Sequence, residues 1–530
     1  MKKNVYLWPF FVLCLLMAAC TDSDAPVTDP DTEEGQEEGA GENDSEKNVT
    51  DMNATIDRFL QKYYLWNDDY KELTRDLTIP YVDGYENFLT TTLMEMTTNT
   101  LDKKWNAEYG LYTLYSYIDR KEKKSTTRTL KTAGVNHNIE KEDPIKSYGI
   151  DRMMAAYIVD EQGNRNGEYA FVVEAVYPGS AATAWGVRRG TVIHKVNGER
   201  ITDKNLEEYY LELLSPTKSQ ITLLALNDGE EINPILKPTE ITPTPILKNS
   251  VIEQGEHKVG YLAYNTFDAA FDDELLEVLA DFKSQGITDL VLDLRYNTGG
   301  HVMTCQMLSG CIAGSRCRGK VFEYYRFNDT RMADVAGMKK EGHQYDPSAG
   351  YFYENFMFDD YYGVNLANYA LSLPHLYVLT TGSTASSAEW VIYALRGIDL
   401  PVTVIGEKTS GKNVGMEVTK FDKGDYTYEL APVSFQGYNA KQETIPEKGI
   451  PVDVEVDEWN NRLGDFGDPT EPLLAKALEM ITGIPAASPE ATVTRAAAPS
   501  LGLQPLPAAP HKRLQGAHRK LQGALMTKEY

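Results

Sequence analysis

Two repeats of a strand, a helix and a second strand constrain the fold of this chain more than any other feature. Their segments are Lys258–Tyr264, Phe271–Phe282 and Asp289–Arg295, and then His375–Thr380, Ala385–Arg396 and Val402–Ile405. Apolar runs of this length predict buried strands, and strands that alternate with helices build parallel sheets. We therefore predict an α/β core over residues 247–483.

Ser386 lies where the second repeat turns from strand into helix. Gly382 permits a sharp turn before it, and Gly397 is a typical stop for the helix that follows. At such a turn the unpaired N–H groups of the first helical turn point at whatever the serine hydroxyl attacks. The position is suited to acyl transfer, although a serine here, taken alone, more often only caps its helix.

A serine nucleophile needs a base, and the chain offers Lys412 in the turn that follows the strand Val402–Ile405. Alone, Lys412 reads as a solvated turn lysine. The strand Asp289–Arg295 runs into a turn that contains Gly299 and Gly300, whose backbone N–H groups can face a ligand. The three features together favour a catalytic site.

Three motifs in this order resemble the S41 peptidases, the tail-specific or C-terminal processing proteases. They are D-L-R-x-N-x-G-G at 293–300, T-A-S-x-x-E at 384–389 and G-E-x-x-x-G-K at 406–412. The resemblance covers roughly residues 50–480. It implies an α/β protease core of the ClpP/crotonase-like kind, with an N-terminal helical domain and a β-rich PDZ-like domain.

Position by position, the resemblance implies that Ser386 is the nucleophile and Lys412 the general base. It also implies an oxyanion hole built from the N–H groups of Gly299 or Gly300 and of Ser387. No metal or cofactor is expected, and the substrates are polypeptides. A lysine base near neutral pH needs its pKa lowered by ~3 units, which desolvation can supply.

One position departs from the family pattern, which often has glutamine four residues after the lysine. This chain has Met416 there, and a thioether is only a weak acceptor. The sequence therefore does not identify the group that orients Lys412. Glu407 would oppose the lowered pKa if its carboxylate came close to the lysine.

Residues 146–237 are expected to form the PDZ-like domain. Tyr177-Pro-Gly-Ser-Ala-Ala, Gly186-Val-Arg-Arg-Gly190 and Val196-Asn-Gly198 carry this resemblance. It implies that the turn Tyr148-Gly149-Ile150 receives a peptide's C-terminal carboxylate while the peptide adds as a strand. A small β-domain that acts only as a spacer is the alternative.

The two ends of the chain read differently from its core. Residues 1–19 read as a signal peptide, and Leu16-Met17-Ala18-Ala19-Cys20 resembles a lipobox, which implies that Cys20 is lipidated. Residues 20–47 form an acidic stretch expected to be a disordered tether, and residues 48–120 a helical domain. An Ala/Pro-rich and basic tail at 484–530 is also expected to be disordered.

These features predict an exported protein, lipid-anchored in a bacterial cell envelope on the periplasmic or surface side. The net charge of −26 gives no support to nucleic acid as a partner. Besides Cys14 and Cys20 the chain has Cys305, Cys311 and Cys317, whose spacing fits no zinc site. One disulfide among them, or burial as small apolar residues, are both compatible with the sequence.

Two other functions compete with the Ser–Lys peptidase. The first is a Ser–His hydrolase, such as an esterase, with His301 beside the glycine turn as its base; no G-x-S-x-G motif surrounds Ser386, however. The second is a non-catalytic peptide-binding protein on the same fold, for which Met416 is the best support.

Overall fold

The computed structural model describes most of the chain. It covers residues 42–485, apart from 82–86, 107–110, 123–133, 136, 138, 161, 341–345, 347, 353–360 and 459–462, together with 502–505 and 527–528. The expected signal peptide and Cys20 lie outside the described residues. The expected tether overlaps them at its end, because the first helix, α1, already begins at Glu42.

A six-stranded sheet forms the predicted α/β core. Its spatial order is β13 (Ile246–Gln254), β14 (His257–Tyr264), β15 (Asp289–Asp293), β18 (Leu376–Thr380), β19 (Val402–Gly406) and β24 (Val454–Glu455). The strands from β14 to β24 run parallel, and β13 pairs antiparallel with β14. The predicted parallel core is therefore confirmed.

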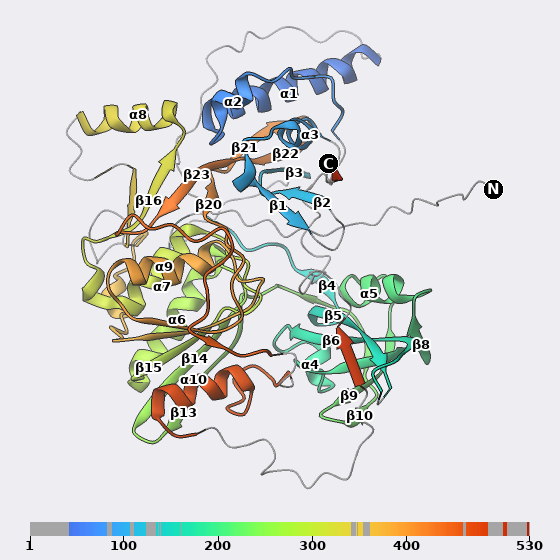
Figure 1. The fold of residues 1–530 in the computed structure, drawn as a ribbon. Helices are drawn as coiled ribbons and strands as arrows, with labels where there is room; N and C mark the ends of the chain where they lie inside the picture. Colours follow the sequence, from blue (N-terminus) through green and yellow to red (C-terminus); the bar gives the residue numbers. More distant parts are fainter. Residues whose placement is uncertain are drawn as a thin grey trace.

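Helices cover both faces of this sheet (Figure 1). They are α6 (Asp272–Gln285), α7 (Val302–Ala313) and α9 (Ser387–Gly397) on one face, and α10 (Pro472–Thr482) on the other. Alternate residues of β15 explain the two layers, since side chains along a strand point to opposite faces. Leu290 and Leu292 join the core with α6, α7 and α9, whereas Val291 packs in the cluster with α10.

The N-terminal region is not the all-helical domain that the periodicity predicts. It contains the helices α1 (Glu42–Tyr63), α2 (Asn67–Lys71) and α3 (Phe88–Glu95) and the strands β1 (Lys103–Asn106), β2 (Leu111–Leu114) and β3 (Tyr117–Glu122). Short strand β26 (Thr527–Lys528) pairs with β2. The described residues of this region do not form a core of their own, because Ile56 and Leu60 share a cluster with Met416 and Val433.

Two smaller sheets connect the N-terminal region to the catalytic part. One has the order β17 (Ala349–Tyr351), β16 (Val321–Phe327), β23 (Val433–Tyr438) and β20 (Val414–Met416), with α8 (Asp329–Lys340) following β16. The other joins β21 (Thr419–Lys423) and β22 (Tyr426–Ala431) to β3. The strand that follows Lys412, β20, is thus held by its pairing with β23.

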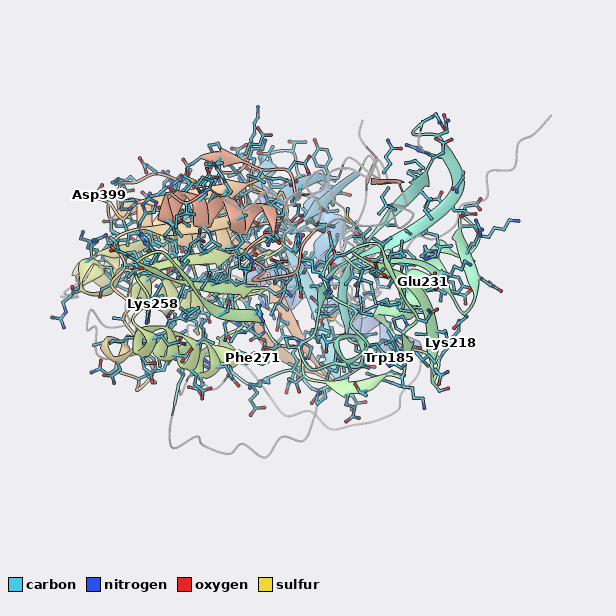
Figure 2. All side chains as sticks on the ribbon, turned by 90° about the horizontal axis from the view of Figure 1, so that it is seen from below. Trp185, Lys218, Glu231, Lys258, Phe271 and Asp399 are labelled. Carbon is cyan, nitrogen blue, oxygen red and sulfur yellow. The ribbon has the colours of Figure 1, made fainter. Side chains whose placement is uncertain are left out.

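Residues 145–241 form a β-rich domain, in the part of the chain where the sequence predicts a PDZ-like domain over residues 146–237. Its elements are β4 (Ile145–Ser147), β5 (Ile150–Val159), β6 (Arg165–Val176), α4 (Ala181–Ala184), β7 (Val192–Val196), β8 (Glu199–Thr202), α5 (Leu206–Leu214), β9 (Ile221–Asn227), β10 (Glu230–Ile232), β11 (Ile235–Leu236) and β12 (Thr239–Ile241). Figure 2 places Trp185, Lys218 and Glu231 of this domain apart from Lys258, Phe271 and Asp399 of the α/β core.

The tail expected to be disordered contributes a strand to this domain. Residues Gly502–Pro505 form β25, which pairs antiparallel with β5. The expectation is therefore wrong for these four residues and for Thr527–Lys528, which form β26. Among the described residues, no helix is long and apolar enough to cross a membrane.

Candidate active site

Ser386 occupies the turn between β18 and α9, as the sequence predicts. Its φ is 55° and its ψ is −125°, a backbone conformation that a non-glycine residue rarely adopts. Such a residue stores strain of about 1–3 kcal/mol, which the surrounding contacts must offset. Ser386 is also buried, so its hydroxyl lies inside the protein rather than on a solvated helix end.

Glu389 offsets part of this cost by joining the backbones of Ser386 and Lys412. Its Oε2 accepts the Ser386 N–H at 2.9 Å and the Lys412 N–H at 2.9 Å. Its Oε1 accepts the Gly411 N–H at 2.8 Å and the Thr409 hydroxyl at 2.5 Å. Two donors on one oxygen must be neighbours, so the nitrogens of Ser386 and Lys412 lie within about 6 Å of each other.

The Glu389 carboxyl is fully buried, and burial raises its pKa to about 7. The four hydrogen bonds that it accepts act in the opposite direction, because they favour the ionised form. An ionised carboxylate accepts from all four donors, whereas a protonated one must turn one oxygen into a donor. The positions of Ser386 and Lys412 are therefore coupled to the charge of Glu389.

Lys412 has a buried side chain with unusual neighbours. Its Nζ lies 3.6 Å from Met416 Sδ and 4.8 Å from the centre of the Tyr115 ring. Met416 thus takes the place that an amide would have, and Tyr115 from the N-terminal region covers the ammonium. The thioether is a weak acceptor, while the ring face attracts a cation, so the two neighbours act differently on a charged lysine. Glu407, which the sequence left open, accepts the Gly382 N–H at 3.2 Å.

The glycine turn after β15 packs directly against Ser386. A Cβ placed on Gly299 would lie 2.8 Å from Ser386 Cβ and 2.8 Å from the Ser387 nitrogen, and the φ of Gly299 is +106°. Only glycine fits both the space and the backbone conformation. The Ser387 hydroxyl donates to the Gly300 carbonyl at 2.8 Å and fixes the turn to the start of α9.

The two glycines differ as oxyanion donors. The Gly299 N–H already donates to Asn297 Oδ1 at 2.7 Å. Within the described part of the chain, the N–H groups of Gly300 and Ser387 have no acceptor. Of the two glycines expected to contribute an oxyanion donor, Gly300 is therefore the one whose N–H is open, as is the N–H of Ser387.

The predicted carboxylate turn lies in the β-rich domain, directly before and at the start of β5. Tyr148, Gly149 and Ile150 are all buried, and the Tyr148 hydroxyl donates to Glu212 Oε1 at 2.8 Å. Gly149 has φ +105°, and a Cβ there would lie 2.2 Å from Ser180 Oγ. Its N–H donates to the hydroxyl oxygen of Ser147 at 2.9 Å, so a serine holds the donor that a carboxylate would use.

His301 and the cysteines face other partners. The His301 Nδ1 lies 3.1 Å from the Phe267 carbonyl oxygen and 3.1 Å from the Ala269 nitrogen, and no bond to Ser386 occurs among the described residues. The three cysteines of the catalytic part are buried and free, so no disulfide forms between them. Burial raises the pKa of the Cys305 thiol well above its usual range, which keeps it protonated.

Sequence reasoning did not assign roles to Glu389, Tyr115 or Asn297. For Glu389 a signal existed, because Ser386 and Glu389 have the spacing of a capping box, in which the acidic side chain returns to the backbone N–H of the cap residue. No local pattern predicts Tyr115, which reaches Lys412 from about 300 residues away in the sequence. Its contact depends on the tertiary fold alone.

A strained buried serine at a helix start, a buried lysine whose backbone is joined to it by one carboxylate, and open backbone donors lie together in this part of the chain. Residues 258–456 match the model of peptidase family S41. This match supports an S41 peptidase, a family of serine-type peptidases, and it covers both the Ser386 turn and the Lys412 turn.

Relatives point to the same family. A probable CtpA-like serine protease of Staphylococcus aureus is 26% identical over 291 residues, or 54% of this chain and 50% of its own length. The carboxy-terminal processing protease CtpB of Bacillus subtilis is 24% identical over 148 residues, or 28% of this chain and 30% of its own. The chain thus spans about half the length, or less, of these curated relatives.

A solved structure extends the likeness to the fold. A Bacteroides fragilis protein assigned to the S41 proteases has a TM-score of 0.58 and 26% identity, covering 81% of this chain and 97% of its own. The α/β part of the present chain therefore has the S41 protease fold.

Proposed function

We propose that this protein is a serine endopeptidase that cleaves polypeptides with a Ser386–Lys412 dyad. The observation that carries this proposal is the shared Glu389 carboxylate, whose Oε2 holds the backbone N–H groups of both residues at 2.9 Å. One buried group thus fixes the origin of the nucleophile's side chain and of the base's side chain. No cofactor enters this mechanism.

In the proposed reaction, neutral Lys412 accepts the proton of the Ser386 hydroxyl while Ser386 Oγ attacks the scissile carbonyl carbon. The carbonyl oxygen gains negative charge and accepts hydrogen bonds from the N–H groups of Gly300 and Ser387. Lys412 then protonates the leaving amine, and an acyl-enzyme remains. Water deprotonated by Lys412 hydrolyses this ester and restores the serine.

Removal of the Ser386 hydroxyl is the direct test. We expect Ser386→Ala to abolish hydrolysis of casein and of unfolded peptides, because the neighbouring hydroxyl of Ser387 is held by the Gly300 carbonyl and does not replace it. Ser387→Ala is the matched control: it keeps the backbone donor and removes only the 2.8 Å bond to the Gly300 carbonyl, so it should weaken activity. A Ser386→Ala variant that retained the wild-type initial rate would contradict the dyad.

We further propose that the β-rich domain is PDZ-like and selects substrates by their C-terminal carboxylates. The support is the strand β5, which starts directly after the buried Gly149 turn. A terminal carboxylate that replaces the Ser147 hydroxyl as acceptor of the Gly149 N–H would add a charge-assisted hydrogen bond. Free-acid peptides should then be cut faster than the same peptides with C-terminal amides.

Ser147→Ala and Gly149→Val separate this recognition from the chemistry. Ser147→Ala frees the Gly149 N–H and should enlarge the preference for the free acid. Gly149→Val forces a side chain against Ser180 and should abolish the preference. Equal rates on both peptides in all three proteins would leave the domain as a spacer only.

Export and lipid anchoring through Cys20 are part of the same proposal and are supported by the sequence Leu16-Met17-Ala18-Ala19-Cys20. A lipidated Cys20 would hold the protease on the periplasmic or surface side of a bacterial envelope. Mass spectrometry of the mature N-terminus tests this. An unmodified Cys20 would overturn the anchor without bearing on the catalytic residues.

A further inference from the structure

The strand β25 lies at the edge of the β-rich domain that the proposed function assigns to substrate peptides. The sheet runs in the order β10, β9, β7, β8, β6, β5, β25, so β5 would be an edge strand without β25. In Figure 1 a red strand from the C-terminal part of the chain lies among the green and blue-green strands of this domain. An edge strand with unpaired N–H and C=O groups is where an extended peptide adds.

β25 runs along β5 in the same direction as a substrate tail bound at the Gly149 turn would run. Its pairing is antiparallel, with Gly502 opposite Val159 and Pro505 opposite Ala156. The strand therefore runs toward the start of β5 and the Gly149 turn as the residue number increases. A substrate that presented its C-terminal carboxylate to Gly149 would pair with β5 in the same direction.

Side chains as well as backbone hold the strand. Leu503 packs against a small cluster that consists of Met154, Ala156 and Val172. The Arg165 Nε donates to Gln504 Oε1 at 3.1 Å. Beside Leu503, the same cluster receives Leu463, which precedes α10 of the catalytic part. The segment thus places one apolar side chain, Leu503, on a cluster that Leu463 also contacts.

We propose that β25 is an internal ligand that occupies the peptide-binding edge of β5, and that a substrate peptide must displace it. This inference rests on the proposed use of that edge for substrates. The competing partner is an extended peptide segment with a C-terminal carboxylate for the Gly149 turn and an apolar residue at the position of Leu503. Occupation by β25 keeps the edge closed until such a segment is present.

Attachment to the same chain strengthens a weak ligand. Short tethers give effective concentrations in the millimolar range. A tethered segment with an intrinsic Kd of ~0.1 mM therefore lowers the apparent affinity of a competing free peptide about tenfold. Displacement by a substrate that is presented at high local concentration remains feasible at this strength. Substrate tails that are abundant or that bind tightly then displace β25, whereas scarce and weakly binding tails do not.

A reversible cross-link tests the placement. Leu503 lies opposite Ile158, and opposite Cα atoms in antiparallel strands are close enough for a disulfide. The double variant Leu503→Cys/Ile158→Cys in the full chain should form this bond within one chain under mild oxidation, as peptide mapping by mass spectrometry can show. Failure to form the bond, or a bond only between two chains, would overturn the inference.

Peptide affinity tests the competition. The probe is a fluorescein-labelled synthetic peptide with the sequence of residues 499–508, and the readout is fluorescence polarisation. Leu503→Asp should bind it about tenfold more tightly than wild type, and the oxidised double variant should lose binding until it is reduced. The matched control, Ile484→Asp, changes an exposed apolar residue outside β25 and should leave the affinity unchanged.

Equal peptide affinity in wild type, Leu503→Asp and the oxidised double variant would refute the competition. Both assays measure binding and bond formation, so they do not depend on hydrolysis. Failure of the proposed peptidase would appear instead as absence of cleavage by the wild-type protein.

Discussion

Glu389→Gln is the substitution that best tests how this site is held together. The carboxylate accepts four hydrogen bonds, from the backbones of Ser386, Lys412 and Gly411 and from the Thr409 hydroxyl. Glutamine has a single oxygen, and its NH₂ group only donates. If the oxygen keeps the Ser386 and Lys412 donors, the NH₂ group faces the Gly411 N–H, and one buried donor is left unsatisfied.

The same substitution removes a buried charge, which acts in the opposite direction on stability. Burial raises the pKa of Glu389 from its usual 4.5 to about 7, so the folded state binds a proton more tightly than the unfolded state. This stabilisation is complete below the unfolded pKa and is lost as the pH rises through the folded pKa. The loss amounts to about 3 kcal/mol above pH 8, comparable with the cost of a broken charge-assisted hydrogen bond.

We therefore expect little net change in stability at pH 8 and a clear change in its pH dependence. Between pH 5 and pH 8 the wild type should lose about 2–3 kcal/mol from this group, measured as a lower urea midpoint, and Glu389→Gln should lack this loss. Initial rates on a peptide substrate at pH 8 should fall about 10- to 100-fold, because displaced catalytic groups lose orientation.

Glu443→Gln is the control, since it makes the same chemical change at an exposed glutamate. It should alter neither the rate nor the pH dependence of the midpoint. Identical urea midpoints of wild type and Glu389→Gln at both pH values, with an unchanged rate, would refute the role assigned to this carboxylate.

Three further predictions follow from the contacts around the site. Lys412→Ala should be nearly as damaging as removal of the serine hydroxyl, and His301→Ala should be mild; the opposite ranking of initial rates would favour a Ser–His mechanism. Met416→Gln should preserve or raise kcat, because an amide oxygen would replace the sulfur 3.6 Å from Nζ; a large loss of kcat would contradict this view of the base. Arg152→Met removes the hydrogen bond to the Tyr296 carbonyl and should lower kcat about tenfold or more even on amidated peptides. Arg188→Met breaks only a more exposed ion pair and should leave kcat unchanged. Equal kcat values of the two variants would contradict a catalytic effect of the contact between the β-rich domain and the Tyr296 turn.

The strands and helices around Ser386 were predictable because each is marked by local signals. The predicted helix Ala385–Arg396 is found as Ser387–Gly397, and the predicted strand His375–Thr380 as Leu376–Thr380. Gly286 ends α6 with φ +68°, as its place after the helix indicates. Buried runs and glycine stops depend on neighbouring residues, so one sequence is enough to find them.

The features that the sequence missed depend on contacts between distant segments. The spacing of apolar residues correctly predicts the helix α1. Its apolar face, however, packs on residues of β20, β22 and β23, and no periodicity indicates this contact. In the same way, β25 is a four-residue strand with two glycine or proline residues, and only the free edge of β5 makes it a strand. In both cases a segment distant in the sequence, rather than the local pattern of residues, determines what the element packs against or pairs with.

The turn that supplies the Gly300 donor is itself held by the β-rich domain. Tyr296 has φ +68°, and its carbonyl oxygen accepts the Arg152 Nη1 at 2.9 Å. The Tyr296 hydroxyl donates to Glu458, which also pairs with Arg189 at 2.7 Å. Arg152 and Arg189 both belong to the β-rich domain, and both are buried, so neither contact is weakened by solvent.

Removal of one member of such a buried charged network is costly, since it leaves a partner without compensation. A shift of the β-rich domain large enough to break these bonds would therefore release Tyr296, three residues before Gly299. The strained turn would then lose the contacts that offset its strain, and the oxyanion donors would lose their fixed positions. The domain proposed to bind substrate tails thus holds, through two arginines, the turn that the proposed chemistry needs.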